Sequence, residues 1–134
     1  MPLVRIDVLE GRPDTELAAI SAAVHRALTE CFGVPPRDRF QVITEHRRGR
    51  LLYDPEYLGV QRTDGIVFIQ VVLSAGRSVE QKSAFYARVA ELVVDTTQVR
   101  REDVTIVLVE NSRENWSFGN GVAQYVTMPS DQWK

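Results

Sequence analysis

The two halves of this chain match each other at a constant spacing. Identical residues recur 65 positions later, in the same order and without gaps, and seven of these pairs outline the repeat. These seven pairs are Gly11 and Gly76, Arg12 and Arg77, Val24 and Val89, Val34 and Val99, Asp38 and Asp103, Val42 and Val107, and Glu45 and Glu110. This regularity indicates that one supersecondary unit is built twice along the chain.

The first half has the pattern of a strand, a helix and a second strand. Residues 3–9 are typical of a strand, and Asp14 is placed to cap the helix that follows the turn at residues 11–13. Apolar residues then recur at helical spacing, at Leu17, Ile20, Val24, Leu28 and Cys31. Gly33 ends this helix in the manner of a glycine just past a helix terminus, and residues 39–45 form the second expected strand.

The second half repeats this order. Residues 66–73 are a nearly continuous apolar run, which is typical of a strand covered on both sides. A turn and cap at residues 76–78 precede a helix, and residues 104–109 form the last expected strand. The apolar face of that helix consists of Phe85, Val89, Leu92 and Val93. The polar residues 46–64 between the halves predict a loop or a short excursion.

These patterns predict an α+β fold made of two β-α-β units, each with a right-handed crossover. We expect one four-stranded mixed sheet with two helices on one face, in a single domain spanning residues 1–134. The pseudo-repeats are residues 2–46 and 66–111, and a tail of residues 112–134 follows them. Because this tail is rich in aromatic residues, we expect it to pack on its own domain or on a neighbouring subunit.

Composition excludes several classes of function. A net charge of −2 gives no general basic field for nucleic acid, and no stretch approaches the ~18–20 apolar residues of a membrane span. Cys31 is the only cysteine, so no intramolecular disulfide can form, which favours a cytoplasmic location. The two histidines and this cysteine make no metal-binding pattern, and we expect neither a metal nor a cofactor.

The topology brings three polar positions together. If the two units join through their first strands, those strands run antiparallel. Pro2, Asp38 and Arg77 then meet at one edge of the sheet, although they are far apart in sequence. Taken alone, each has a plainer explanation as a common second residue, a surface charge or a turn residue. At the mirror site the residue equivalent to Pro2 is Val67, which lies mid-chain and cannot supply an amine.

The chemistry of these three residues is mutually consistent. Proline after Met1 favours removal of that methionine, which would make Pro2 a secondary amine at the amino terminus. An α-amino group titrates near ~7.7–8.0, so burial or a nearby Asp38 decides whether it acts as a base or as an acid. Arg77 follows a strand and opens a helix, where its planar fork could hold a substrate carboxylate.

Longer stretches resemble a known family. The opening PLVRIDVLEGR is similar to 4-oxalocrotonate tautomerase and its relatives. EGRPDTEL, AAVHRAL, VPPRDRFQV, GVQRTDGIVFIQV and ENWSFGNGVAQY resemble the malonate semialdehyde decarboxylase group of the tautomerase superfamily. The resemblance covers essentially the whole chain, including the tail.

The resemblance implies a homotrimer with an amino-terminal proline in a pocket near the subunit interface. The catalytic proline, the water-activating aspartate and the carboxylate-binding arginine of that group fall on Pro2, Asp38 and Arg77. Its aromatic wall falls on Trp116, Phe118 and Tyr125. The implied reaction is loss of CO₂ from a short 3-oxo acid, with possible hydration of unsaturated acids, and the implied partner is a small carboxylate substrate.

One departure leaves the reaction open. The decarboxylase group carries a second arginine at the position of Ala75, and the cis-3-chloroacrylic acid dehalogenase group carries one at the position of Ser74. Arg12 and Arg62 are candidates to compensate for it. The alternatives are a keto–enol tautomerase of 2-oxo acids, in which Pro2 is a neutral base, and a non-catalytic binding module on the same fold. An unrelated ferredoxin-like dimer would leave Pro2 and the matched pairs unexplained.

Overall fold

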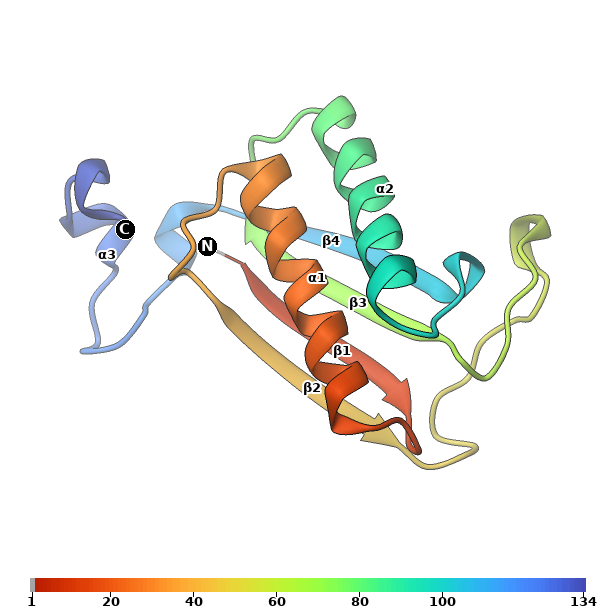
Figure 1. Cartoon of the computed structure of the whole chain (residues 1–134). Coiled ribbons are helices and arrows are strands. Elements are labelled where there is room, and N and C mark those ends of the chain that lie inside the picture. Colours follow the sequence, from red (N-terminus) through yellow and green to blue (C-terminus); the bar gives the residue numbers. More distant parts are fainter. Residues whose placement is uncertain (1) are drawn as a thin grey trace.

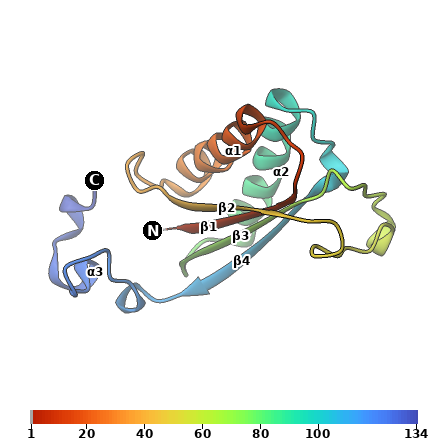
Figure 2. The ribbon, with the colours of Figure 1, turned by 90° about the horizontal axis from the view of Figure 1, so that it is seen from below.

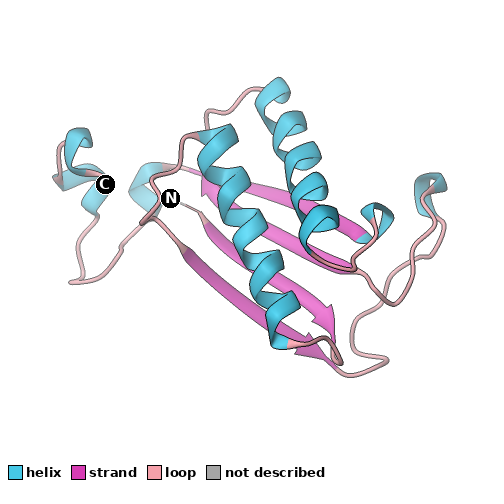
Figure 3. Cartoon of the chain, viewed as in Figure 1, coloured by secondary structure: helices cyan, strands magenta, loops and turns pink. Residues whose placement is uncertain are grey.

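The computed structural model describes residues 2–134, so Met1 lies outside the described residues (Figures 1 and 3). The strands are β1 (Leu3–Leu9), β2 (Phe40–His46), β3 (Val67–Ser74) and β4 (Val104–Asn111). The helices are α1 (Asp14–Phe32), α2 (Val79–Thr96) and the short α3 (Gln124–Thr127). Single 3₁₀ turns are η1 (Tyr57–Gly59), η2 (Arg101–Asp103), η3 (Arg113–Asn115) and η4 (Ser130–Gln132).

The strand order is β2-β1-β3-β4, which confirms the predicted mixed sheet joined through the first strands of the two units. Strands β1 and β2 are parallel, as are β3 and β4, whereas β1 and β3 are antiparallel. Arg5 pairs with Gln70, its own equivalent 65 residues later. The pseudo-twofold axis of the duplication therefore passes through this pair.

Both long helices cover one face of the sheet (Figure 2). Side chains alternate across β1, and Val4, Ile6 and Val8 are fully buried on the helix side. Phe85 of α2 is also fully buried and stacks on Phe32 of α1 at 4.7 Å between ring centroids. Fully burying one such side chain stabilises the fold by about 1.5–3 kcal/mol, so this layer holds the two units together.

The residues that cap the two long helices determine where each helix begins and ends. Pro13, not Asp14, occupies the N-cap position of α1, because its carbonyl accepts the first helical hydrogen bonds; Asp14 is the first helical residue. Gly33 ends α1 with φ of 65°, as the sequence predicts. Ser78 caps α2, and its hydroxyl accepts from the backbone N–H of Gln81 while the Gln81 side chain accepts from the backbone N–H of Ser78.

The other face of the sheet carries no helix (Figure 2). Among its side chains Val42, Val107 and Val109 are 40%, 52% and 41% exposed. We call this surface the open face. The tail of residues 112–134 does not cover it but lies beyond the sheet edge, near the start of β1 (Figures 1 and 2). None of the helices in the described part of the chain combines the length and apolar character needed to cross a membrane.

Candidate active site

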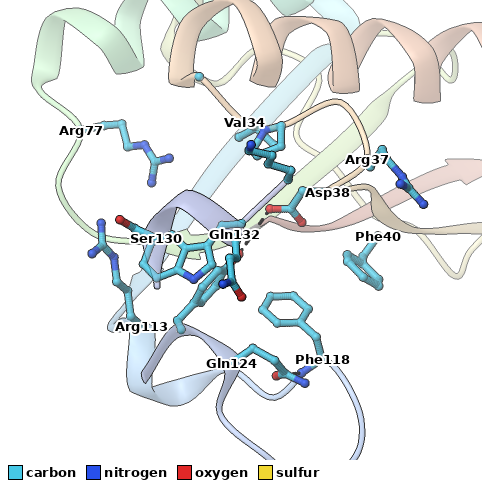
Figure 4. A pocket seen from close by; sticks show the side chains of 15 residues that line it. Val34, Arg37, Asp38, Phe40, Arg77, Arg113, Phe118, Gln124, Ser130 and Gln132 are labelled. Carbon is cyan, nitrogen blue, oxygen red and sulfur yellow. Dashed lines mark hydrogen bonds between the residues drawn. The ribbon is translucent and has the colours of Figure 1, made fainter. Parts of the chain in front are cut away.

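A cavity of about 470 Å³ lies where the α1–β2 segment, the β3–α2 turn and the tail meet (Figure 4). It is lined by Gly33, Val34, Pro35, Arg37, Asp38, Phe40, Arg77, Arg113, Phe118, Gln124, Tyr125, Ser130, Gln132, Trp133 and Lys134. Four of the six residues expected at the site are in this set. Three arginines and one lysine against one aspartate give the cavity a positive balance, which favours an anionic ligand.

Asp38 is positioned by the segment that leaves α1. The αL conformation of Gly33 turns the chain back towards the sheet, and the backbone N–H of Asp38 donates to the carbonyl of Pro35 at 3.0 Å. The Tyr125 hydroxyl donates to Asp38 Oδ2 at 3.4 Å, so the tail contacts the α1–β2 segment directly (Figure 4). Burial raises the pKa of Tyr125, which keeps this hydroxyl protonated and able to donate.

Arg77 is held by backbone carbonyls, with one face of its guanidinium against a ring. Its Nη1 donates to the carbonyl of Ser74 at 2.8 Å and its Nη2 to the carbonyl of Phe32 at 3.4 Å. The guanidinium lies over the Phe32 ring, 5.3 Å from the centroid. Burial lowers the pKa of Arg77, and the charge of Arg113 lowers it further. An arginine stays charged near neutral pH despite such a shift, so Arg77 is a fixed cation in the cavity wall.

The aromatic residues of the tail form one connected cluster. Phe118 and Tyr125 line the cavity and meet edge to face at 5.0 Å. Trp116 is outside the lining; it stacks on Phe118 at 5.5 Å, and its Nε1 donates to Asn111 Oδ1 at 2.7 Å. Trp116 therefore supports the wall from behind. Trp133, which sequence reasoning did not select, lines the cavity and contacts Tyr125 at 4.7 Å.

Pro2 is buried at the start of β1 and is outside the set of residues that line the cavity. The next residue, Leu3, pairs with Phe40 of β2 and with Val72 of β3. Pro2 therefore lies at the edge of the sheet where β2 begins, just after Asp38, and where β3 ends, just before Arg77. The sheet order brings the three segments to one edge, as the sequence indicates.

At the mirror end of the sheet, the residues equivalent to Arg77 and Asp38 form hydrogen bonds with the connector between the two units. Arg12, equivalent to Arg77, donates to the carbonyl of Gly65. Asp103, equivalent to Asp38, is 1% exposed and accepts from the backbone N–H of Thr63 at 2.7 Å and from its hydroxyl at 2.6 Å. The connector thus supplies hydrogen-bond partners to both residues from within the chain, which favours a structural role for this end.

Arg12 and Arg62, the candidates to compensate for the second arginine that is absent at position 75, both lie outside the cavity. Arg12 is at the mirror end, and the Nη1 of Arg62 donates to three carbonyls of the connector, those of Asp54, Tyr57 and Val60. Arg113 of η3 and Arg37 do line the cavity, and sequence reasoning missed both. Within residues 2–134 no group of three or more His, Cys, Asp or Glu side chains is arranged to hold a metal ion.

Two family models, both described as "Tautomerase enzyme", match this chain. One matches residues 38–119, more than half of the chain, and the other matches residues 2–61. The chain belongs to the tautomerase family. It is accordingly an enzyme of the tautomerase superfamily, and the cavity beside the start of β1 is its candidate active site.

Two curated relatives of this tautomerase come from Bacillus subtilis (strain 168). "Probable tautomerase YusQ" is 41% identical over 126 residues, which cover 94% of this chain and 99% of the relative. "Probable tautomerase YrdN" is 35% identical over 127 residues, which cover 95% of this chain and 98% of the relative. The similarity therefore includes the tail as well as the sheet.

Solved structures give the same family and a narrower group. A malonate semialdehyde decarboxylase (FG41) inhibited by 3-bromopropiolate is 41% identical with a TM-score of 0.88, covering 93% of this chain and 95% of that one. A second malonate semialdehyde decarboxylase, with decarboxylase and hydratase activities, is 35% identical with a TM-score of 0.88, covering 93% and 96%. A fused 4-OT symmetric trimer, 22% identical with a TM-score of 0.75 over 92% and 98% of the two chains, shares the fold.

Proposed function

We propose that this tautomerase-family enzyme uses Pro2 as an amino-terminal catalytic group, after removal of Met1, on a short 3-oxo or unsaturated carboxylic acid. The proposed reaction is decarboxylation of the malonate semialdehyde type, with hydration as a side activity. One observation carries the proposal. A cavity at the sheet edge where β1 begins has the fixed cation Arg77 on one side and Asp38 on the other (Figure 4), and Asp38 accepts a hydrogen bond from the Tyr125 hydroxyl.

Arg77 binds the substrate carboxylate in this mechanism. Its guanidinium is already oriented by the carbonyls of Ser74 and Phe32, so little side-chain freedom is lost when the anion binds. Charge-assisted hydrogen bonds from an arginine fork fix both the position and the plane of a carboxylate. The 3-oxo group of a short acid bound in this way would extend towards Asp38 and the start of β1.

Pro2 supplies the electron sink. A carboxylate such as Asp38 close to the amine favours its protonated form, which can donate to the carbonyl oxygen of the substrate. The bond between the carboxylate carbon and C2 then breaks, its electron pair moves towards the carbonyl, and CO₂ leaves. The enol takes a proton at carbon and becomes the aldehyde. An iminium formed between Pro2 and the substrate would accept the same electron pair.

Asp38 and Tyr125 also suit the activation of water. The carboxylate can orient a water molecule and take its proton, while the Tyr125 hydroxyl holds the carboxylate in place. Addition of that water to an activated alkene or alkyne acid gives the hydratase activity. The similarity to two malonate semialdehyde decarboxylases, one of them with both activities, supports this assignment.

A second candidate is keto–enol tautomerisation of a 2-oxo acid. The two curated relatives that cover nearly the whole chain are both described as probable tautomerases, which favours it. In that reaction Pro2 would be neutral and would move a proton between carbon and oxygen as a base. Arg77 would keep its role as the carboxylate-binding cation.

We also propose a homotrimer. The open face exposes Val42, Val107 and Val109, and burial of these side chains against other subunits would stabilise an assembly. The fold is shared with a fused 4-OT symmetric trimer, which is in line with this proposal. Measurement of the mass in solution by light scattering tests it, because a monomer has a mass of 15.2 kDa.

The reaction is tested by a proton NMR time course with malonate semialdehyde, on protein whose intact mass shows that Met1 is absent. Acetaldehyde should form with the wild-type enzyme and should not form with Pro2→Ala or Asp38→Asn. If no acetaldehyde forms but a 2-oxo acid exchanges its C3 protons in a Pro2-dependent way, the tautomerase alternative holds. If neither reaction depends on Pro2, the catalytic proposal is wrong and a binding module remains.

A further inference from the structure

We propose that Arg113, from the tail, is the second carboxylate-binding cation of this enzyme and forms a two-arginine clamp with Arg77. This inference rests on the proposed function, because it concerns the acid that binds in the same cavity. It names a substrate-binding residue outside the duplicated units. Figure 4 shows Arg77 and Arg113 on one side of the cavity and Asp38 on the other.

The sheet places the two arginines side by side. Strands β3 and β4 are parallel and end together, with Ser74 paired to Asn111. The backbone N–H of Ala75 donates to the carbonyl of Asn111 at 2.8 Å, which ties the two exits from the sheet to each other. Arg77 follows Ala75 by two residues, and Arg113 follows Asn111 by two residues. Their separation is therefore set by the sheet and not by a flexible loop.

Both guanidiniums rest on aromatic rings. Arg77 lies over Phe32 at 5.3 Å from the ring centroid, and Arg113 lies over Trp133 at 5.0 Å. Stacking on a ring occupies one face of a guanidinium and leaves its N–H groups in the plane available for an acceptor. Trp133 is in contact with Tyr125, so the cluster that orients Arg113 is the same one that reaches Asp38.

Among the described residues, neither arginine has a direct ion pair: Glu110 acts on Arg77 only through its charge, and its carboxylate is paired with Lys82 at 2.6 Å. No salt bridge of Arg77 or Arg113 to an acidic side chain is found in residues 2–134, although nine other such contacts are present there. Burial and then the charge of Arg113 lower the pKa of Arg77, so the two cations lie close enough to repel each other. A bound carboxylate would relieve this repulsion and would accept hydrogen bonds from both forks.

A second cavity, of about 230 Å³, also lies between these two arginines. Ser74 borders it and is 2% exposed, and its hydroxyl has no hydrogen-bond partner within residues 2–134. A buried hydroxyl without a partner is costly, and an oxygen of a bound carboxylate is a chemically suitable acceptor. The two arginines border both cavities, whereas Ser74 borders only the smaller one. The clamp therefore consists of the two cations, and it requires no arginine at position 75.

The test is titration calorimetry with malonate at low ionic strength, which measures binding without turnover. The variants are Arg113→Gln, Arg113→Lys and the control Arg48→Gln, which is the equivalent position 65 residues earlier and lies at the mirror end. Arg113→Gln should raise the dissociation constant about 10- to 100-fold, the range expected for a lost charged hydrogen bond. Arg113→Lys should recover part of the loss, and Arg48→Gln should bind as the wild type does.

The inference is wrong if Arg113→Gln binds malonate as tightly as the wild type, if Arg48→Gln weakens binding equally, or if the wild type does not bind malonate. With an active enzyme, Arg113→Gln should raise KM much more than it lowers kcat, whereas a structural role in the tail would not give this split. Pro2→Ala separates the two proposals. If it binds malonate normally and the wild type shows no turnover, the proposed reaction fails while the clamp stands.

Discussion

The two equivalent aspartates should respond in opposite ways to the same substitution. Asp103→Asn should cost stability, because Asp103 is 1% exposed and accepts two short hydrogen bonds from Thr63. Asparagine keeps an acceptor for the Thr63 N–H but loses the charge, and a hydrogen bond to a charged group contributes about 1.5–3 kcal/mol. We therefore expect the free energy of unfolding to fall by about 1.5–3 kcal/mol, with turnover largely retained in the folded protein.

Asp38→Asn should instead abolish turnover at a smaller cost in stability. Asp38 is half-buried at the cavity wall, and its hydrogen bond from Tyr125 is long, at 3.4 Å. Because Asp38 is only half-buried whereas Asp103 is 1% exposed, its substitution should lower the free energy of unfolding by less than Asp103→Asn does. Urea unfolding followed by tryptophan fluorescence, at one fixed protein concentration, measures both variants. A stable Asp103→Asn together with an unstable Asp38→Asn would refute our assignment of one structural and one functional end.

Three further predictions concern the core, acid stability and the cavity. Phe85→Ala should lower the free energy of unfolding by about 3–5 kcal/mol in urea titrations, because this ring is fully buried. Hydrogen bonds from Arg88 and then Arg26 lower the pKa of Glu30 from 4.5 to about 2. The stability that this carboxylate contributes is therefore present above its unfolded-state pKa and is lost as the pH falls towards 2. Glu30→Gln should therefore flatten the decline of the melting temperature on acidification, and an unchanged slope would contradict this. Tyr125→Phe should lower kcat roughly ten-fold, because it removes the hydrogen bond to Asp38. This factor should stay constant up to about pH 9, because burial raises the pKa of the Tyr125 hydroxyl and keeps it protonated.

The sheet could be predicted from sequence because each strand has its own apolar pattern and the duplication limits the ways of joining the units. The expected strand at residues 39–45 is found at Phe40–His46, and the one at residues 66–73 at Val67–Ser74. A shift of one residue is common at element ends. Asp14 was wrongly expected to cap α1, because the carbonyl of Pro13 accepts the first helical hydrogen bonds.

The site could be predicted only where the duplication or the sheet order constrains it. Asp38 and Arg77 border the cavity because both positions are fixed by strand ends. Arg113 and Trp133 were not foreseen, because the tail lies outside the repeat and its path depends on contacts between aromatic rings. One signal was available: β4 is parallel to β3, so residues just past its end must lie beside Arg77.

The central claim is that Pro2 is a reactive amine beside the Arg77 cavity. It is tested most directly by treating protein of verified mass, lacking Met1, with 3-bromopropiolate, which inhibits one of the similar decarboxylases. Peptide mapping by mass spectrometry should then show one label per chain, on the peptide that begins with Pro2, and malonate should protect against it. Labelling confined to Cys31, the only thiol in the chain, or a Pro2 peptide that stays unmodified, would contradict the account.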